Sequence, residues 1–150
     1  MSSLTNTNLP RVGVGVFIFR DGKFLMGQRK GSHGSGSWSV PGGWLEYQES
    51  FEDASAREVM EETGVAIKNI RFAALTNNVF KDEKVHSLTV WMMSDWDNGE
   101  PMINEPDKFI DQKWVDFDTL PDPLFLPWKS LLEGEFLVEI KRQLELSKSL

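Results

Sequence analysis

The residue types most able to do chemistry in this chain lie between Gly43 and Val65, in the stretch GWLEYQESFEDASAREVMEETGV. Glu58 and Glu62 are four residues apart and Glu61 is three from Glu58, so a helix would project all three side chains from one face. Like charges this close repel each other unless a cation neutralises them. Carboxylate oxygens suit Mg²⁺ or Mn²⁺ better than zinc, which favours His and Cys. The spacing therefore predicts a divalent-metal site that acts on phosphate groups.

Capping signals place this acidic cluster on a helix. Ser50 is followed three positions later by Asp53, an arrangement that starts helices, and Gly64 is suited to the left-handed residue that ends them. On the metal face, one turn earlier, small residues are expected to leave room for phosphates; these are Ala54 and Ser55. The opposite face is expected to pack on the core through Ala56, Val59, Met60 and Thr63. The alternative is a solvated acidic helix face without a ligand.

The stretch also resembles the signature of a known family. It fits the pattern G-x5-E-x7-R-E-U-x-E-E-x-G-U, in which U is a bulky aliphatic residue, and is similar to the Nudix hydrolase family at each fixed position: Gly43, Glu49, Arg57, Glu58, Val59, Glu61, Glu62, Gly64 and Val65. A wider resemblance, over roughly residues 11 to 132, is to the small nucleoside triphosphate pyrophosphatases of that family, including a plant cytosolic enzyme and a human enzyme for thiopurine nucleotides.

The resemblance implies roles for the matching residues. Glu58 and Glu62 would be the principal Mg²⁺ ligands, with Mn²⁺ as a substitute, and the Gly43 carbonyl would complete the coordination. Glu61 would bind the metal directly or through water, or act as general base. Arg57 would pair with neighbouring carboxylates including Glu49, although its other interpretation is a surface ion pair of little energetic value.

Residues outside the signature extend the predicted site. Glu105 or Asp107, in the loop INEPDK, could supply a further metal ligand or the general base, and Asp111 is a weaker candidate. Arg29, at a strand end beside Lys30, could grip a phosphate with two parallel hydrogen bonds, or could simply be solvated.

The base-binding end is predicted from glycines and aromatic residues. The double glycine Gly42-Gly43 is expected beside the substrate. Trp44 replaces the histidine usual in the resembling branch, and either stacks on a base or serves as an aromatic wedge in the fold. Phe125, Leu126 and Trp128 either build an apolar base pocket or belong to the core. The two histidines, His33 and His86, show no triad or metal-ligand spacing.

Composition limits the classes of protein that fit. A chain of 150 residues with 40% apolar residues suffices for one domain, and residues 1–10 are expected to be flexible. The net charge of −7 argues against binding nucleic-acid polymers. No cysteine is present, which excludes disulfides and thiol catalysis. Neither a signal peptide nor a membrane span is evident, so we expect a cytoplasmic protein without membrane contact.

The predicted elements alternate between strands and helices. Strands are expected at Val12–Phe19, Lys23–Gln28, Ile67–Thr76, Val85–Ser94 and Phe109–Val115, with short extended pieces at Trp38–Val40 and Trp44–Glu46 and a flexible loop at Lys30–Ser37. From Pro127 onward, apolar residues at helical intervals predict one amphipathic closing helix. The expected fold is α/β, with a mixed sheet in an α/β/α sandwich, as the Nudix resemblance also implies.

The sequence thus predicts a Mg²⁺-dependent pyrophosphohydrolase, resembling MutT-like enzymes, that cleaves a nucleoside triphosphate, ordinary or oxidised such as 8-oxo-dGTP, to the monophosphate and pyrophosphate. Alternative substrates are pterin triphosphates, nucleotide sugars and prenyl diphosphates. A noncatalytic nucleotide-binding module is the alternative of a different class. The resemblance further implies a homodimer.

Overall fold

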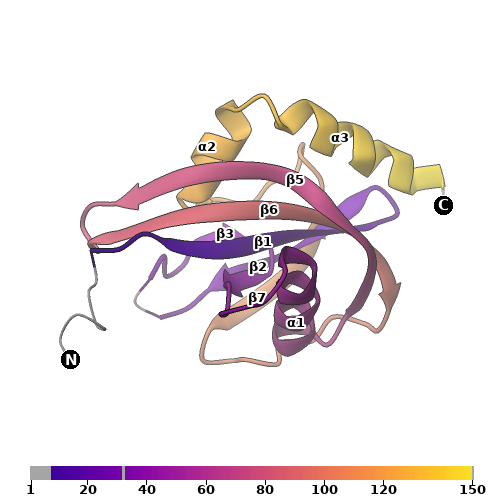
Figure 1. The fold of residues 1–150 in the computed structure, drawn as a ribbon. Helices are drawn as coiled ribbons and strands as arrows, with labels where there is room; N and C mark the ends of the chain where they lie inside the picture. The colour runs from indigo at the N-terminus through magenta and orange to yellow at the C-terminus, as the bar shows by residue number, and fades with distance from the viewer. Residues whose placement is uncertain (1–7, 32, 150) are drawn as a thin grey trace.

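The computed structural model describes residues 8–31 and 33–149, and within them seven strands form one sheet flanked by helices (Figure 1). The strands are β1 (Arg11–Arg20), β2 (Lys23–Arg29), β3 (Trp38–Ser39), β4 (Gly42–Trp44), β5 (Ala66–Phe80), β6 (Val85–Asn98) and β7 (Phe109–Val115). The helices are α1 (Phe51–Thr63), α2 (Pro127–Glu133) and α3 (Leu137–Leu146), followed by a 3₁₀ turn at Ser147–Ser149.

The sheet is mixed, as predicted. Its main path runs β3-β2-β1-β6-β5, while β4 pairs with β1 and β7 pairs with β2. The pair β1 and β6 is parallel, with Val14 opposite Val90, and the other pairings are antiparallel. The long strands β5 and β6 each extend beyond the predicted segments, and β4 begins at the double glycine rather than after it.

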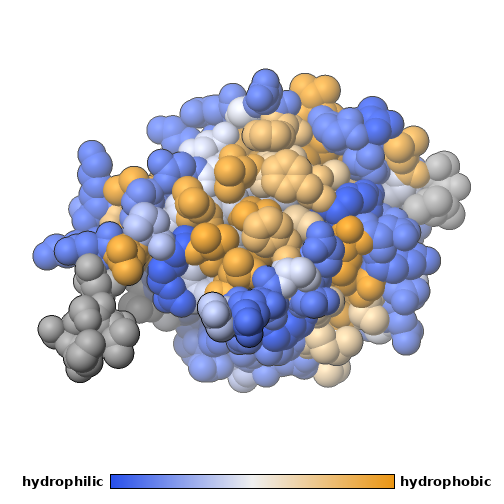
Figure 2. Space-filling model, in the orientation of Figure 1, coloured by the Kyte–Doolittle hydropathy of each residue, from blue (hydrophilic) through white to orange (hydrophobic). Residues whose placement is uncertain are grey.

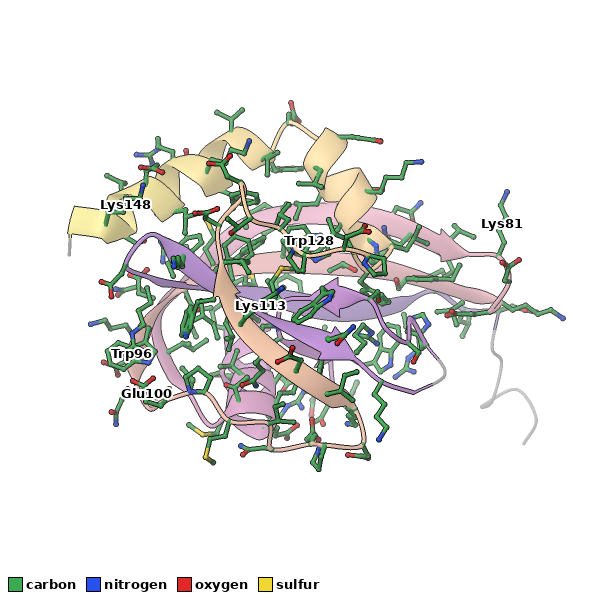
Figure 3. The ribbon with its side chains drawn as sticks, turned by 180° about the vertical axis from the view of Figure 1, so that it is seen from behind. Lys81, Trp96, Glu100, Lys113, Trp128 and Lys148 are labelled. Carbon is green, nitrogen blue, oxygen red and sulfur yellow. The ribbon has the colours of Figure 1, made fainter. Side chains whose placement is uncertain are left out.

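Alternating side chains on β1 build a core on each face of the sheet. Val16 and Ile18 pack with Ala54 and Val59 of α1 in one core. Phe17 and its neighbours pack on the other face with α2 and α3, where the fully buried Trp128 lies between helix and sheet (Figure 3). Because successive strand residues point to opposite faces, one strand serves both layers. The α/β/α sandwich is confirmed.

Helix α1 begins and ends as the capping signals predicted. The Ser50 side chain accepts a hydrogen bond from the Asp53 N–H at 3.0 Å, and Gly64 takes a left-handed φ of 75° while its N–H donates to Met60 O. The predicted faces are partly wrong.

Ala54 and Ser55 are fully buried against the sheet, so they do not provide space for phosphates, whereas Ala56 and Met60 are exposed. Of the four residues expected on the core face, Val59 and Thr63 are buried. The packing face of α1 therefore includes Ala54 and Ser55 of its first turns together with Val59 and Thr63.

The prediction of a single closing helix was also wrong. The backbone at Gly134 is extended, with φ −89° and ψ 165°, and separates α2 from α3. Ile140 and Leu144 of α3 still reach the core. The apolar period continues across the break because both helices cover the same face of the sheet (Figure 1).

Part of the sheet beside α1 remains uncovered. Figure 2 shows apolar side chains gathered over this face, where Phe72, Leu75 and Val79 of β5 are each about half exposed. None of the described helices is long and apolar enough to cross a membrane. The predicted flexibility of residues 1–10 falls mostly on residues 1–7, which lie outside the described residues.

Candidate active site

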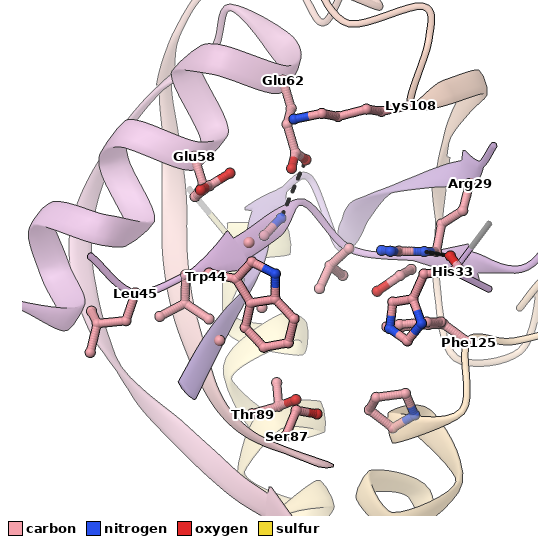
Figure 4. A pocket seen from close by; sticks show the side chains of 18 of the residues that line it. Arg29, His33, Trp44, Leu45, Glu58, Glu62, Ser87, Thr89, Lys108 and Phe125 are labelled. Atoms are coloured by element: carbon pink, nitrogen blue, oxygen red, sulfur yellow. Dashed lines mark hydrogen bonds between the residues drawn. The ribbon is translucent and has the colours of Figure 1, made fainter. Parts of the chain in front are cut away.

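A cavity of about 860 Å³ opens beside the C-terminal half of α1, with walls from β1, β4 and β6 and from the segments carrying Lys108 and Phe125 (Figure 4). It gathers nearly all the residues that the sequence singled out: Arg29, Gly42, Gly43, Trp44, Arg57, Glu58, Glu61, Glu62 and Phe125 all line it. Glu105 is not part of the wall, and neither are the weaker candidates Asp107, Asp111, Leu126 and Trp128.

Arg57 organises the acidic end of this cavity. Its Nε donates to Glu49 Oε2 at 2.6 Å, and its Nη1 donates to Glu58 Oε1 at 2.8 Å and to Glu61 Oε2 at 3.3 Å. A further bond reaches the Trp44 carbonyl at 3.2 Å, which ties the helix to β4. The pairing with Glu49 lowers the pKa of that carboxyl to about 2. Arg57 therefore holds the signature carboxylates together.

The double glycine allows two carboxylates to approach the backbone of β4. A Cβ placed on Gly43 would lie 2.5 Å from the Glu58 carboxylate, so a larger residue would displace that side chain from its place against the strand. The Gly42 N–H donates to Glu62 Oε2 at 3.3 Å. Glu58 and Glu62 therefore lie against the strand rather than pointing into open solvent, as Figure 4 shows.

Burial and mutual repulsion disfavour the charged form of these two carboxyl groups. Desolvation raises the pKa of Glu62 well above its ordinary value, and the charges of Glu58 and Glu105 raise it further. Desolvation also raises the pKa of Glu58, although its contact with Arg57 acts in the opposite direction. Glu62 is only 6% exposed. A buried carboxylate in this position favours a bound cation or a proton.

The donor set fits a divalent cation. Glu58 and Glu62 supply hard oxygen donors and lack the sulfur and imidazole groups typical of zinc sites. However, no group of three or more His, Cys, Asp or Glu side chains stands ready to hold an ion in the part of the chain that the structure describes. The expected third ligand, Glu61, is half exposed and bound to Arg57.

The loop that carries Glu105 is fastened to the end of α1. Met102 N–H donates to Thr63 O at 2.9 Å, and Asn104 N–H donates to Glu62 O at 3.2 Å. This brings the Glu105 charge close enough to raise the pKa of both Glu58 and Glu62. Glu105 itself accepts a hydrogen bond from Lys108 Nζ at 3.3 Å.

Lys108 lines the cavity and approaches Glu62 in Figure 4, although no motif in the sequence points to it. Its only sequence signal was its place in the INEPDK loop. Asp107 and Asp111 are exposed and do not line the cavity, and Asp111 bonds to the N–H of Gln112.

The opposite end of the cavity is aromatic and cationic. The guanidinium of Arg29 lies 4.0 Å from the ring centre of Phe125, and its Nε donates to the His33 carbonyl at 3.2 Å. Desolvation lowers the pKa of Arg29, an effect that the charges of Glu62 and Glu83 oppose. The His33 side chain pairs with Glu83 and packs edge-on against Phe125. His33 thus belongs to the cavity wall, although it carried no sequence signal.

Trp44 is the largest aromatic surface in the middle of the cavity (Figure 4). The guanidinium of Arg11 lies 4.0 Å from its ring centre. Two neighbours of Phe125 do not share its role, because Trp128 is fully buried in the core and Leu126 is 44% exposed and outside the cavity wall. The apolar pocket predicted from Phe125, Leu126 and Trp128 therefore reduces to Phe125.

Comparison with known proteins agrees with this geometry. The family model described as the NUDIX domain matches residues 9–132. The NAD-capped RNA hydrolase NudC of Photorhabdus laumondii is 36% identical over 106 residues, which cover 71% of this chain and 39% of that protein. NudC of Escherichia coli shows the same identity and coverage. The chain thus spans about two fifths of the length of these curated relatives.

Solved structures share the fold. A MutT NUDIX hydrolase from Burkholderia pseudomallei superposes with a TM-score of 0.78 at 32% identity, covering 85% of this chain and 98% of that one. An ADP-ribose pyrophosphatase from Streptococcus suis gives 0.66 at 26% identity, covering 89% and 93%. The NUDIX domain of NrtR from Shewanella oneidensis, solved with ADP ribose, gives 0.71 at 24% identity over 93% and 96%, a likeness of fold alone.

The names of these relatives refer to NAD-capped RNA, MutT and ADP-ribose, and do not single out the triphosphate branch that the longer resemblance suggested. Hydrolases of this kind generally use divalent metals, which agrees with the donor set at α1. Since the family model covers more than half of the residues and includes the signature stretch, the chain belongs to the Nudix hydrolase family.

Proposed function

We propose that this protein is a Mg²⁺-dependent pyrophosphohydrolase that cleaves a nucleoside triphosphate to the monophosphate and pyrophosphate. The observation that carries the proposal is the placement of Glu58 and Glu62 against Gly43 and Gly42 at the mouth of an 860 Å³ cavity. A cavity of this size accommodates a nucleotide. Oxidised or otherwise modified triphosphates such as 8-oxo-dGTP are candidate substrates because Trp44 offers a broad stacking surface.

The residues of the chain have separate tasks in this reaction. Glu58 and Glu62 would hold the metal ion, with the Gly43 carbonyl as a further donor, and Mn²⁺ could replace Mg²⁺. When bound, the ion would neutralise phosphate oxygens and lower the pKa of water. Arg57 keeps the carboxylates in place, while Arg29 and Lys108 present positive charge to the phosphates. Trp44 and Phe125 contact the base.

Two carboxylates remain candidates for the general base. Glu61 lines the cavity and is half exposed, which lets it exchange its bond with Arg57 for one with water. Glu105 lies near both metal-binding glutamates but is bound to Lys108. We favour Glu61, since a base must reach the attacking water within hydrogen-bond distance. Rates of Glu61→Gln and Glu105→Gln measured across pH distinguish the two candidates. Substitution of the general base should abolish the fall in rate at low pH, whereas substitution of the other carboxylate should keep it.

A second substrate class is favoured by the relatives. NudC and the ADP-ribose pyrophosphatase are named for substrates in which a pyrophosphate links two groups. The cavity has an aromatic face at Trp44 and another at Phe125, which could receive the two halves of such a molecule. A nucleoside diphosphate derivative, including a capped RNA end, is therefore the alternative. Pterin triphosphates, nucleotide sugars and prenyl diphosphates belong in the same substrate screen.

The test is phosphate and pyrophosphate release from about twenty phosphoanhydrides, with Mg²⁺, with Mn²⁺ and with EDTA. We expect one EDTA-sensitive nucleoside triphosphate to be preferred, with pyrophosphate as product. Preference for ADP-ribose or a capped dinucleotide would select the alternative. If nothing is hydrolysed with either metal while nucleotides still bind, the protein is a noncatalytic binding module. Homodimerisation and a cytoplasmic location stay predictions, which a sizing column and cell fractionation would test.

A further inference from the structure

Polar side chains interrupt the apolar face of the sheet beside the base end of the cavity. Across β5 and β6, Thr76 pairs with Thr89 and Asn78 pairs with Ser87, so all four point to one face. Thr76, Asn78 and Ser87 are each less than 10% exposed. Buried polar groups reduce stability unless they have hydrogen-bond partners. The hydrogen bonds that these groups already make therefore determine which donors and acceptors remain for a ligand.

The hydrogen bonds among these strand residues have a defined order of donors and acceptors. Trp91 Nε1 donates to Thr76 Oγ1 at 2.9 Å, and an indole nitrogen can only donate. The Thr76 hydroxyl in turn donates to Asn78 Oδ1 at 3.0 Å, and the Asn78 oxygen therefore faces the threonine. The Thr89 hydroxyl donates to the same oxygen at 3.3 Å. The hydrogen of Thr89 is therefore engaged, while its oxygen keeps lone pairs that can accept.

Thr89 and Ser87 both line the cavity, and Figure 4 shows them together beyond the edge of the Trp44 ring, on the wall that we call the floor. Ser87 is 95% buried, and its hydroxyl makes no hydrogen bond to any of the described residues. A flat base stacked on Trp44 would direct an edge toward these two hydroxyls. The floor thus combines an acceptor of fixed direction with a hydroxyl that can rotate.

We propose that Thr89 Oγ1 accepts a hydrogen bond from an amino group of the base, with Ser87 beside it, so that the cavity selects nucleotides whose bases carry an exocyclic amine. Asn78 and Thr76 act as positioning residues, since they fix the direction of the Thr89 hydroxyl. This inference rests on the proposed function and adds a rule for which substrates it prefers. It concerns the base end of the cavity and is independent of the carboxylates.

The experiment compares nucleotides that differ only in one amino group, GTP with ITP and ATP with purine riboside triphosphate. We expect the amino-bearing member of at least one pair to have a kcat/KM about tenfold higher, as one hydrogen bond allows. The difference should appear mainly in KM, because the base does not react. Thr89→Val should abolish the preference and Thr89→Ser should keep it.

A variant of the positioning residue sharpens the test. Asn78→Ala releases the hydrogen of Thr89, which can then donate to a ligand, so the preference for the amine should shrink even where total activity is kept. A purely structural role for Asn78 would lower activity on both members of a pair equally. The ratio within each pair, rather than either rate, is therefore the readout.

Binding of GMP and IMP, measured by calorimetry, separates this inference from the proposed reaction. If no triphosphate is hydrolysed but GMP binds more tightly than IMP, the hydrolase proposal fails and the selection rule stands. If the unmodified protein hydrolyses both members of both pairs equally, or if Thr89→Val keeps the preference, the selection rule is overturned. Circular dichroism checks folding, and should Thr89→Val not fold, the two pairs measured on the unmodified protein decide the matter.

Discussion

The two ends of the cavity are built in different ways. At the acidic end, residues of one helix and the turn before it are held by a single guanidinium, that of Arg57. At the base end, residues from β5, β6 and the Phe125 segment meet although they are far apart along the chain. In the proposed reaction the acidic end, a local structure, would carry the chemistry, while the base end, a tertiary structure, would select the ligand. Variants at the two ends should change different kinetic constants.

The largest effect is expected from Glu62→Gln. Loss of this ligand should lower kcat by about 10² to 10³, the range seen when one electrostatic contact to a transition state is removed. The thermal stability of the protein should be unchanged or higher, because a buried repulsive charge is lost. Steady-state kinetics with Mg²⁺ and a melting curve measure both. Glu52→Gln, on an exposed turn of the same helix, is the matched control, and full activity in Glu62→Gln would rule out the proposed metal site.

A smaller loss is expected from Arg57→Lys. Lysine keeps the charge but cannot reach Glu49, Glu58 and the Trp44 carbonyl together. Metal affinity should fall about 10- to 100-fold, as for other residues that orient ligands. Mn²⁺ titration followed by activity measures this. The same change at Arg142, which pairs with the exposed Glu139 and does not line the cavity, should have no effect.

Trp44→Ala should act on KM instead. Loss of a stacking surface is expected to raise KM about tenfold for large bases while kcat changes little. The control is Trp96→Ala, which also removes a tryptophan. Trp96 lies at the opposite end of the sheet from Lys81 (Figure 3). If Trp44→Ala reduces the amount of folded protein and Trp96→Ala does not, Trp44 is an aromatic wedge in the fold. It would then no longer count as a ligand-binding residue of the base end.

The smallest effect concerns the pH dependence of stability without metal. Glu62 ionises at a higher pH in the folded protein than in the unfolded chain, where the value is near 4.3. Above that lower value the folded state retains a proton that the unfolded state releases, so the free energy of unfolding falls as pH rises. Melting temperatures in EDTA should therefore decline from pH 4.5 toward neutral, less so in Glu62→Gln. A slope unchanged by the substitution would assign the effect to other groups.

The acidic end could be predicted from sequence because its contacts follow helical spacing. Arg57 bonds Glu61 across one turn and Glu49 just before the helix, and these relations can be derived from residue numbers alone. The fold was also predictable in outline, since β1 shows the continuous apolar run of a strand buried on both faces. The break at Gly134 was not, because the apolar period is the same on both sides of it.

The base end could not be predicted in the same way. Thr76, Asn78, Ser87 and Thr89 are ordinary strand residues in sequence, and their hydrogen-bonded network depends on the register between β5 and β6. His33 and Lys108 likewise join the cavity through loops whose paths no short motif specifies. Local patterns thus reveal chemistry more readily than specificity.

The crowding of glutamates around Arg57 has a kinetic consequence. Four carboxylates, those of Glu46, Glu49, Glu58 and Glu61, lie within 4 Å of one guanidinium, and Glu62 is buried beside them. Free polyphosphate is repelled by such a surface, whereas a divalent cation is attracted. Assembly should therefore be ordered, with the cation or its nucleotide complex arriving first, and uncomplexed nucleotide in excess should slow turnover by withholding the cation.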